Sequence, residues 1–381
     1  MRPGNWAPAL ASFGVCAYIA GSALPLPWDA PLLILALLGG LALILDYRDL
    51  PNSNPVLFAL VFVFVTARLL STALSENIGR SVRLGTAFPP GVLLFVLIAG
   101  HFRGVTAIRV LYVTFASIGL GLSSGVLWTA WRTGRLSPFG LVADLGSPII
   151  VVPNDLTLLS VIAPLSLSLV HGAPGRAVRT IAALSLVLSV GAIALARSRV
   201  ALLTLILSVS LATALIRMRL AIVAGVLLFT VALLGETLLG FPLTAKFLSG
   251  DEGRIGLWAA AWAKFLEAPW LGHGPHTFVY TEPGDVIVTW AHNLYLEVLM
   301  EQGLVGLLTL AALLGFGLAA AWNTQHAVLG EARYLCSAAF AALIAFCFAA
   351  VIESSFSRQW VVITFFALLG TIARLTLAEP I

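Results

Sequence analysis

The chain has 381 residues, of which 60% are hydrophobic and only 10% are charged, and its mean hydropathy is +1.02. Soluble domains carry about 25% charged residues and about half apolar ones, so this composition excludes a soluble fold and indicates a polytopic membrane protein. The formal net charge of +4 is too small to indicate a nucleic-acid partner, and none is expected.

Apolar runs separated by charged or Pro/Gly-rich breaks predict an all-α fold with about twelve transmembrane helices, because one spanning helix needs about 20 apolar residues. The segment 88–100 is short and has Pro89 and Pro90 near its start, so we expect it to be broken or extended from the preceding loop. The predicted spans are residues 8–25, 30–46, 55–74, 88–100, 105–128, 153–170, 178–196, 200–216, 220–240, 294–321, 334–352 and 360–377.

These spans divide the chain into residues 1–240 with nine helices, a larger loop subdomain at 241–293, and residues 294–381 with three helices. Within the loop, residues 253–268 have aliphatic and aromatic side chains at helical spacing and are followed by Pro269. This pattern predicts an amphipathic helix lying along the membrane interface. Lys and Arg residues are divided evenly between the two faces, so the positive-inside rule leaves the orientation open.

A polar sequence, AHNLYLEVLMEQGLV at 291–305, precedes the tenth predicted span. Titratable groups at a membrane boundary are costly unless they are paired or used. A histidine can accept a proton near pH 7, so His292 suits a general base, while the alternative is that His292 or Asn293 only caps the helix. Glu297 and Glu301 are candidates to orient His292 or to bind a substrate hydroxyl, and the alternative for either is an interfacial charge that pairs with an arginine. For Glu301 we expect the pairing with an arginine.

Three arginines are candidates for binding an anion, because guanidinium groups bind phosphate oxygens bidentately. Arg197 and Arg199 lie between the seventh and eighth spans, where the alternative is that they are solvated or snorkelling side chains. Residues i and i+2 diverge on an ideal helix, so both face one ligand only if this turn is irregular. Arg254 heads the interfacial helix, where Asp251 and Glu252 offer an alternative salt bridge.

The loop 129–152 on the same face contributes Arg135, and Asn154 follows at its exit. We interpret these two residues, with Asn293 and Glu297, as supporting residues of the same centre. The sequence GHGPHTF at 272–278 adds two histidines that would form a metal site together with His292. Its glycines and proline are typical of a turn, and no HExxH element is present, so we predict a tight turn over the membrane and no metal.

Together these segments resemble the O-antigen ligase/O-antigen polymerase superfamily of bacterial envelope enzymes. The resemblance covers roughly residues 150–310. Its most specific part is HNLYLEVLMEQGLVGLL at 292–308, and it is also carried by SRVALL at 198–203 and by residues 253–278. PNDLTLLSVIAPL at 153–165 resembles the family less closely.

The resemblance implies a many-helix fold of the GT-C type in the bacterial inner membrane, with an active site on the periplasmic face. It implies a glycan donor linked to undecaprenyl pyrophosphate and a reaction without metal, nucleotide or other cofactor. The catalytic histidine of the family corresponds to His292, and its essential arginines correspond to Arg197, Arg199 and Arg254.

The predicted function is therefore transfer of an O-antigen glycan to lipid A–core oligosaccharide, with inversion at the anomeric carbon. The short chain and compact loops favour this ligase function over an O-antigen polymerase, which extends the carrier-linked glycan. A protein O-oligosaccharyltransferase is a further alternative. A lipid or solute transporter is the alternative outside enzymes. A transporter is expected to have charges near mid-membrane, and Arg68 alone is predicted to be deeply buried.

Overall fold

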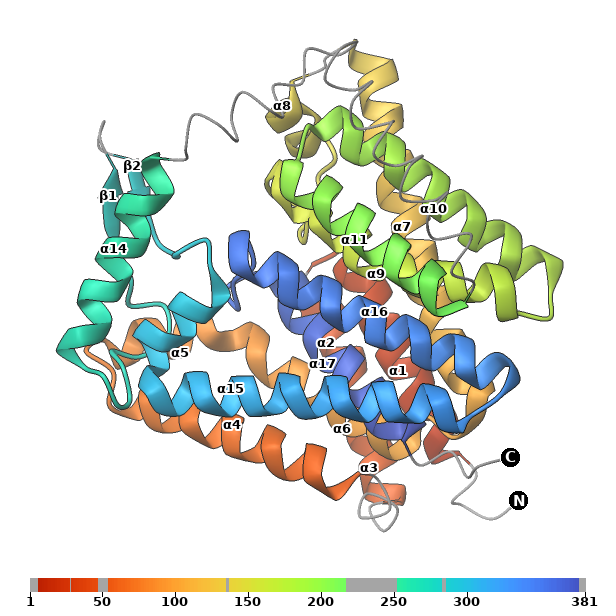
Figure 1. Ribbon diagram of the computed structural model, residues 1–381, viewed down its shortest axis with the longest axis horizontal. Coiled ribbons are helices and arrows are strands. Elements are labelled where there is room, and N and C mark those ends of the chain that lie inside the picture. The colour runs from red at the N-terminus through yellow and green to blue at the C-terminus, as the bar shows by residue number, and fades with distance from the viewer. Residues whose placement is uncertain are drawn as a thin grey trace.

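The computed structural model describes residues 6–27, 29–46, 54–134, 137–216, 252–282 and 286–376. This part of the chain is mostly helical, with one antiparallel pair of short strands (Figure 1). Its helices are α1 (Ala7–Ser22), α2 (Asp29–Ile34), α3 (Gly40–Leu45), α4 (Pro55–Ala73), α5 (Ile78–Leu84), α6 (Phe88–His101), α7 (Gly104–Thr133), α8 (Pro138–Ala143), α9 (Thr157–Gly172), α10 (Arg176–Ala196), α11 (Arg199–Ile216), α14 (Glu252–Glu267), α15 (Leu294–Ala327), α16 (Gly330–Ile352) and α17 (Gln359–Leu375), and its strands are β1 (Tyr280–Glu282) and β2 (Val286–Val288).

Eight helical stretches among the described residues are long and apolar enough to cross a membrane, which confirms an all-α polytopic membrane protein. Three shorter apolar helices, Ala7–Ser22, Asp29–Leu45 and Gln359–Leu375, coincide with other predicted spans. The predicted span 220–240 lies outside the described residues, as does the first part of the loop predicted at 241–293. The count of twelve helices, the three-part division and the GT-C type of the fold stay predictions.

The segment around Pro89 and Pro90 is extended from the loop before it, as the sequence predicts. Helix α5, a short 3₁₀ turn at Gly85–Ala87 and α6 follow one another without a break from Ile78 to His101. The two prolines lie in the first turn of α6, where the missing N–H groups would have no partner within the helix. The α5 portion is therefore a short helix leading into a membrane span.

Helix α17 lies at the centre of the bundle. Every side chain from Trp360 to Ala373 is buried, and the helix packs against α6, α15 and α16. A helix that is apolar on all sides is buried in lipid or among other helices, and the burial of α17 shows that other helices surround it. The Trp360 indole N–H at its start donates to Asp155 (2.9 Å), which joins α17 to the start of α9.

Helix α14 coincides with the amphipathic helix that the sequence predicts at 253–268, and its place at the membrane interface stays a prediction. Leu257, Ala261 and Phe265 are buried in a small cluster with the first turns of α15, while Ile255 and Trp262 are exposed. Together with the β1–β2 hairpin, α14 lies at one end of the bundle, on the left of Figure 1. One face of this helix is thus packed on protein and the other is free to contact the bilayer surface.

Helix α15 is interrupted at Gly303, whose backbone (φ 65°, ψ −164°) is not helical. The loop that follows α14 approaches this break: the Leu304 N–H donates to the Pro269 carbonyl (2.8 Å), and the Gly274 N–H donates to the Glu301 carbonyl (2.9 Å). A Cβ atom on Gly303 would lie 2.3 Å from the carbonyl carbon of Trp270. The break therefore lets loop backbone bond to helix backbone directly.

Gly272 has the same function on the loop side of this contact. Its φ is +67°, and a Cβ atom there would lie 2.3 Å from the carbonyl carbon of Glu301. Glycine adopts positive φ without steric cost and permits such a close approach. The glycines of the GHGPHTF sequence thus form the tight turn that the sequence predicts.

Candidate functional site

A cavity of about 580 Å³ lies where five segments far apart in the sequence converge. They are the start of α8, the residues before α9, the α10–α11 turn, the segment before α15 and the residue after α16. In Figure 1 these ends lie on the same side of the bundle as α14 and the hairpin. The lining residues are Pro138, Phe139, Val152, Pro153, Asn154, Ala196, Arg197, Arg199, Trp290, His292 and Glu353.

The α10–α11 turn directs two predicted arginines into this cavity. Helix α10 ends at Ala196, Arg197 adopts the left-handed conformation (φ 50°, ψ 31°), and α11 begins at Arg199. Because the turn is irregular, the two side chains do not diverge as they would on a continuous helix. Ser198 between them donates from Oγ to the Asn154 side chain (2.9 Å), which fixes the turn against the start of α9.

His292 also has a left-handed backbone, with a φ of 50°, and its side chain is about three-quarters buried. Its Nδ1 lies 2.9 Å from Oε1 of Glu353. A carboxylate at this position accepts from Nδ1–H and favours the tautomer in which Nε2 carries the lone pair. While the bond to Glu353 is formed, Nε2 is the nitrogen that carries the lone pair and can accept a proton.

The Trp290 indole N–H lies 3.1 Å from the same Nδ1 atom of His292. Because an indole N–H only donates, its bond to Nδ1 requires the other tautomer, so the contacts with Trp290 and Glu353 are alternatives.

The Arg358 guanidinium lies 5.1 Å from the centre of the Trp290 ring and pairs with Asp155 (3.3 Å). Asp155 also accepts from two backbone N–H groups just before it, which ties the cavity wall to α17.

Glu353 joins three residues that the sequence predicts for the site. Its Oε2 accepts from the Asn154 side-chain amide (2.9 Å) and from the Arg254 guanidinium (3.0 Å), while Oε1 contacts His292. Arg254 also donates to the Ile352 carbonyl (2.8 Å) and does not line the cavity. Arg254 is thus bonded beside the cavity to the end of α16 and to Glu353, the residue that sequence reasoning missed.

A sequence signal for Glu353 was present. Glu353 follows the apolar segment of α16 and is the first residue of the polar stretch ESSFSR at 353–358. The criterion that selects His292, a titratable group at a membrane boundary, applies to Glu353 equally.

Two of the supporting residues bond to segments that carry the site. The Asn293 side chain caps α15 by accepting from the backbone N–H groups of Tyr295 (3.0 Å) and Leu296 (3.1 Å). Glu297 is buried and accepts from Ser355 Oγ (2.7 Å), so it holds the segment carrying Glu353, and Glu353 takes the orienting position expected for Glu297. Arg135 lies outside the described residues.

Glu301 pairs with an arginine, as the sequence predicts. Its Oε2 lies 4.0 Å from Nη1 of Arg68, and its Oε1 accepts from the His276 backbone N–H (2.6 Å). Arg68 is deeply buried, as expected from its place in a span.

The two histidines of the GHGPHTF sequence have separate surroundings. His273 bonds to Glu76 and to the Lys264 carbonyl (2.7 Å). Burial, with the charges of Arg68 and Arg80, lowers the pKa of His276 to about 3, so this side chain is neutral at pH 7. Within the described ranges, no group of three or more His, Cys, Asp or Glu side chains is arranged to hold a metal ion.

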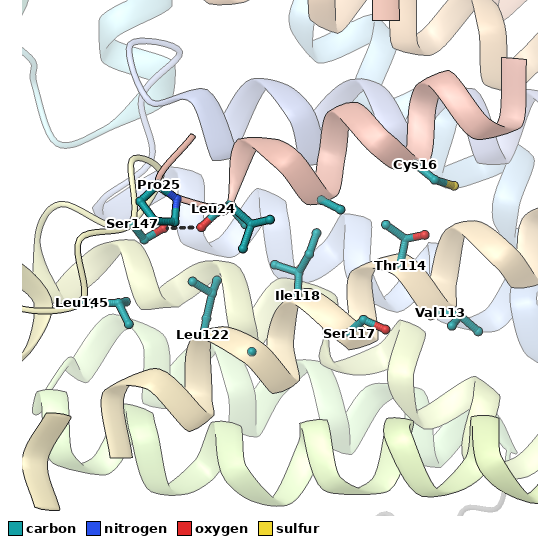
Figure 2. Close-up of a pocket in the computed structure, with 13 residues that line it drawn as sticks. Cys16, Leu24, Pro25, Val113, Thr114, Ser117, Ile118, Leu122, Leu145 and Ser147 are labelled. Carbon is teal, nitrogen blue, oxygen red and sulfur yellow. Dashed lines mark hydrogen bonds between the residues drawn. The ribbon is translucent and has the colours of Figure 1, made fainter. Parts of the chain in front are cut away.

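A second cavity, of about 510 Å³, lies between α1 and α7 and is nearly all apolar. Figure 2 shows Leu24, Ile118 and Leu122 in it, with Ser147 at one end donating to the Ala23 carbonyl (3.0 Å). It contains no Arg, Lys, His, Asp or Glu side chain among the described residues, so it does not suit an anionic group.

Comparison with known proteins identifies the region that carries the site. Residues 184–311 match the model of a protein family described as O-antigen ligase, and this region contains Arg197, Arg199, Arg254 and His292. An O-antigen ligase of Pseudomonas aeruginosa is 31% identical over 106 residues, which are 28% of this chain and 26% of that relative. The resemblance to the O-antigen ligase superfamily is therefore confirmed over this part of the chain. The chain aligns with about a quarter of the relative's length.

Proposed function

We propose that this chain, a member of the O-antigen ligase superfamily over residues 184–311, moves a glycan from undecaprenyl pyrophosphate to lipid A–core oligosaccharide. The family match supports a glycan-transferring membrane enzyme. The observation that carries the proposal is the convergence of His292, Arg197 and Arg199 on one cavity of about 580 Å³. We propose that this cavity opens on the periplasmic side of the inner membrane.

In the proposed reaction, Nε2 of His292 removes the proton from an acceptor hydroxyl. The hydroxyl oxygen attacks the anomeric carbon of the donor from the face opposite the pyrophosphate. A new glycosidic bond forms, the bond from the anomeric carbon to the phosphate oxygen breaks, and the configuration inverts. Undecaprenyl pyrophosphate leaves with the bonding electron pair, and the histidine proton is later lost to water.

The arginines stabilise the negative charge that develops on the leaving pyrophosphate. Arg197 and Arg199 line the cavity, whereas Arg254 acts beside it through Glu353. A fixed donor at a developing oxyanion contributes about 3–4 kcal/mol where water is excluded, and a positioned base contributes about 10²–10⁴-fold in rate. The arginines and His292 therefore contribute comparable amounts, and the reaction is proposed to need no metal.

The function is tested by following a radiolabelled glycan on undecaprenyl pyrophosphate in vesicles that contain the purified protein and lipid A–core. Label bound covalently to lipid A–core is the expected product. Longer glycans on the carrier would instead identify a polymerase, and label on protein a protein glycosyltransferase. Label that crosses the membrane without any new covalent bond would identify a transporter and contradict the proposal.

Replacing Glu353 with glutamine is expected to lower kcat for transfer by on the order of 10²–10⁴-fold with little change in donor KM. The amide of glutamine has no negative charge, and its NH₂ group can donate to Nδ1, which favours the wrong tautomer of His292. Steady-state kinetics over a range of donor concentrations measures both parameters.

Glu331→Gln is the matched control for this variant. Glu331 lies at the other end of α16 and forms an ion pair with Arg109, so its replacement makes the same chemical change far from the cavity. Equal transfer rates in the two variants, or a loss that appears wholly in KM, would contradict the positioning function of Glu353.

A further inference from the structure

The imidazole of His292 has two neighbours at one nitrogen, and these neighbours require opposite positions of its proton. The Trp290 indole N–H donates to Nδ1 (3.1 Å), whereas Oε1 of Glu353 lies 2.9 Å from the same atom. The indole bond requires a lone pair on Nδ1 and so a proton on Nε2, whereas the carboxylate bond requires a proton on Nδ1. Only the tautomer that bonds to Glu353 leaves Nε2 able to accept a proton.

Neither tautomer of His292 satisfies both neighbours while the indole stays in this position. With a lone pair on Nδ1, this nitrogen and the Glu353 oxygen are two acceptors 2.9 Å apart with no hydrogen between them. With a proton on Nδ1, that proton faces the hydrogen of the Trp290 indole. Polar groups in protein interiors are normally paired, so we expect one of the two neighbours to have another partner when the cavity holds its ligand.

Glu353 is the fixed neighbour. Its second carboxylate oxygen, Oε2, accepts from the Asn154 amide (2.9 Å) and from the Arg254 guanidinium (3.0 Å), and its side chain is buried. Hydrogen bonds from two other segments therefore hold the carboxylate in place. Moving it away from His292 would strain or break both of them.

Trp290 is the neighbour that can change its partner. Its half-buried side chain lines the cavity, in the segment between β2 and α15 that has no regular secondary structure. The indole N–H is its single hydrogen-bonding group, and Nδ1 of His292 is the acceptor that it has among the described residues. The Arg358 guanidinium lies over the face of the ring, so that contact does not use the N–H.

The ligand proposed for the cavity offers the indole a better acceptor. Arg197 and Arg199 line the same cavity as Trp290, and we propose that they bind the pyrophosphate of the donor. An N–H group bonds more strongly to an ionised oxygen than to a neutral acceptor such as an imidazole lone pair. If the indole N–H bonds to the pyrophosphate, Nδ1 of His292 can carry a proton and donate it to the Glu353 carboxylate. One hydrogen bond between neutral groups is then replaced by two bonds to ionised oxygens.

We propose that Trp290 binds a pyrophosphate oxygen of the lipid-linked donor and is thereby a positioning residue for His292. Before the donor binds, the indole N–H keeps the proton of the imidazole on Nε2. When the donor binds, the indole turns to the pyrophosphate, the imidazole loses the Nε2 proton to water and gains one from water at Nδ1, and Glu353 holds this tautomer. The inference rests on the proposed function, because it takes the donor pyrophosphate as the ligand of this cavity.

¹⁵N NMR of the full-length protein in detergent, labelled at its histidine rings, measures the tautomer, because protonated and unprotonated ring nitrogens differ widely in chemical shift. The signals of His292 are those that His292→Asn removes. The probe is undecaprenyl pyrophosphate, at a pH at which the ring shifts show a neutral imidazole. We expect the Nε2–H tautomer without the probe and the Nδ1–H tautomer with it. The same tautomer in both samples would overturn the proposal.

Trp290→Phe keeps an aromatic ring beside Arg358 but removes the indole N–H. This variant is expected to have the Nδ1–H tautomer of His292 even without the probe. By calorimetry it is expected to bind undecaprenyl pyrophosphate about 10-fold more weakly, because one hydrogen bond to an ionised group is lost. An unchanged affinity would contradict the assignment of Trp290.

Trp322→Phe is the matched control. Trp322 also packs against a histidine, His326, with ring centres 4.6 Å apart, but at the other end of α15. This variant is expected to behave like the unchanged protein in both measurements. If Trp290→Phe fails to fold, Glu353→Gln decides, since its amide can donate to Nδ1. It is expected to keep the Nε2–H tautomer with and without the probe, and a change of tautomer on adding the probe would refute the proposal.

Neither measurement depends on glycan transfer, so the two proposals fail separately. If label never reaches lipid A–core but undecaprenyl pyrophosphate still changes the tautomer of His292, the proposed function is wrong and the assignment of Trp290 stands. If transfer proceeds while the probe leaves the tautomer unchanged, the assignment of Trp290 alone is wrong.

Discussion

Replacing His292 with asparagine is expected to lower the rate of glycan transfer by on the order of 10²–10⁴-fold while the protein still folds and inserts. The imidazole is the group oriented to accept the hydroxyl proton, and the asparagine amide is not a base. Asparagine suits this position because His292 has a φ of 50°, a conformation that asparagine tolerates better than most residues. His292→Ala would combine the loss of the base with backbone strain.

Transfer to purified lipid A–core measures this effect, with thermal unfolding in detergent as the check on folding. His326→Asn is the control, because His326 is exposed in the last turn of α15 and bonds only locally to the Trp322 carbonyl (2.7 Å) among its described contacts. Transfer by His292→Asn at a rate near that of the control would remove His292 from the proposed mechanism.

Gly303→Ala is expected to destabilise the protein by about 3–5 kcal/mol, or to prevent its insertion. The backbone of Gly303 lies in a region that glycine alone adopts readily, and the new methyl group would lie 2.3 Å from the Trp270 carbonyl carbon. Loop and helix backbone are hydrogen-bonded to each other here, so moving either segment to make room for the methyl group would break these hydrogen bonds. The loop leads through the hairpin to His292, so transfer is expected to fall as well.

The apparent melting temperature in detergent measures this change, and Gly315→Ala is the control in the same helix. No atom lies within 4 Å of a Cβ at Gly315, so this substitution is expected to leave stability unchanged or to raise it by about 0.5–1 kcal/mol. The same melting temperature in both variants would show that the break at Gly303 tolerates a side chain.

The transmembrane helices were predictable because each is a continuous apolar run. Helix α4 at Pro55–Ala73 and α16 at Gly330–Ile352 lie within a few residues of the predicted spans. The extension of α6 toward Ile78 followed from the two prolines. The residues of each segment alone were sufficient to predict the spanning helices and this extension. Apolar content decides which segments enter the membrane, and proline favours the first turn of a helix.

The candidate site was predictable in part. His292 and Arg199, which were selected by their position at the membrane boundary, line one cavity. Glu353, the partner of His292, is 61 residues away in sequence, and only tertiary packing brings it there. The left-handed turn at Arg197 has no sequence signal, because the chain has an arginine where glycine is usual. Arg254 pairs with Glu353 across the fold, a partner that its neighbours in sequence do not indicate. The alternative salt bridge with Asp251 lies outside the described residues.

The central position of α17 has a consequence for biosynthesis. This helix follows every other described helix in the chain, so the ribosome delivers the innermost one after its neighbours have already entered the bilayer. The Trp360 indole can reach Asp155 only after α17 has been synthesised, so the bond that joins α17 to the start of α9 forms late. The packing of α17 against α6, α15 and α16 likewise completes the core of the bundle after those helices have been made.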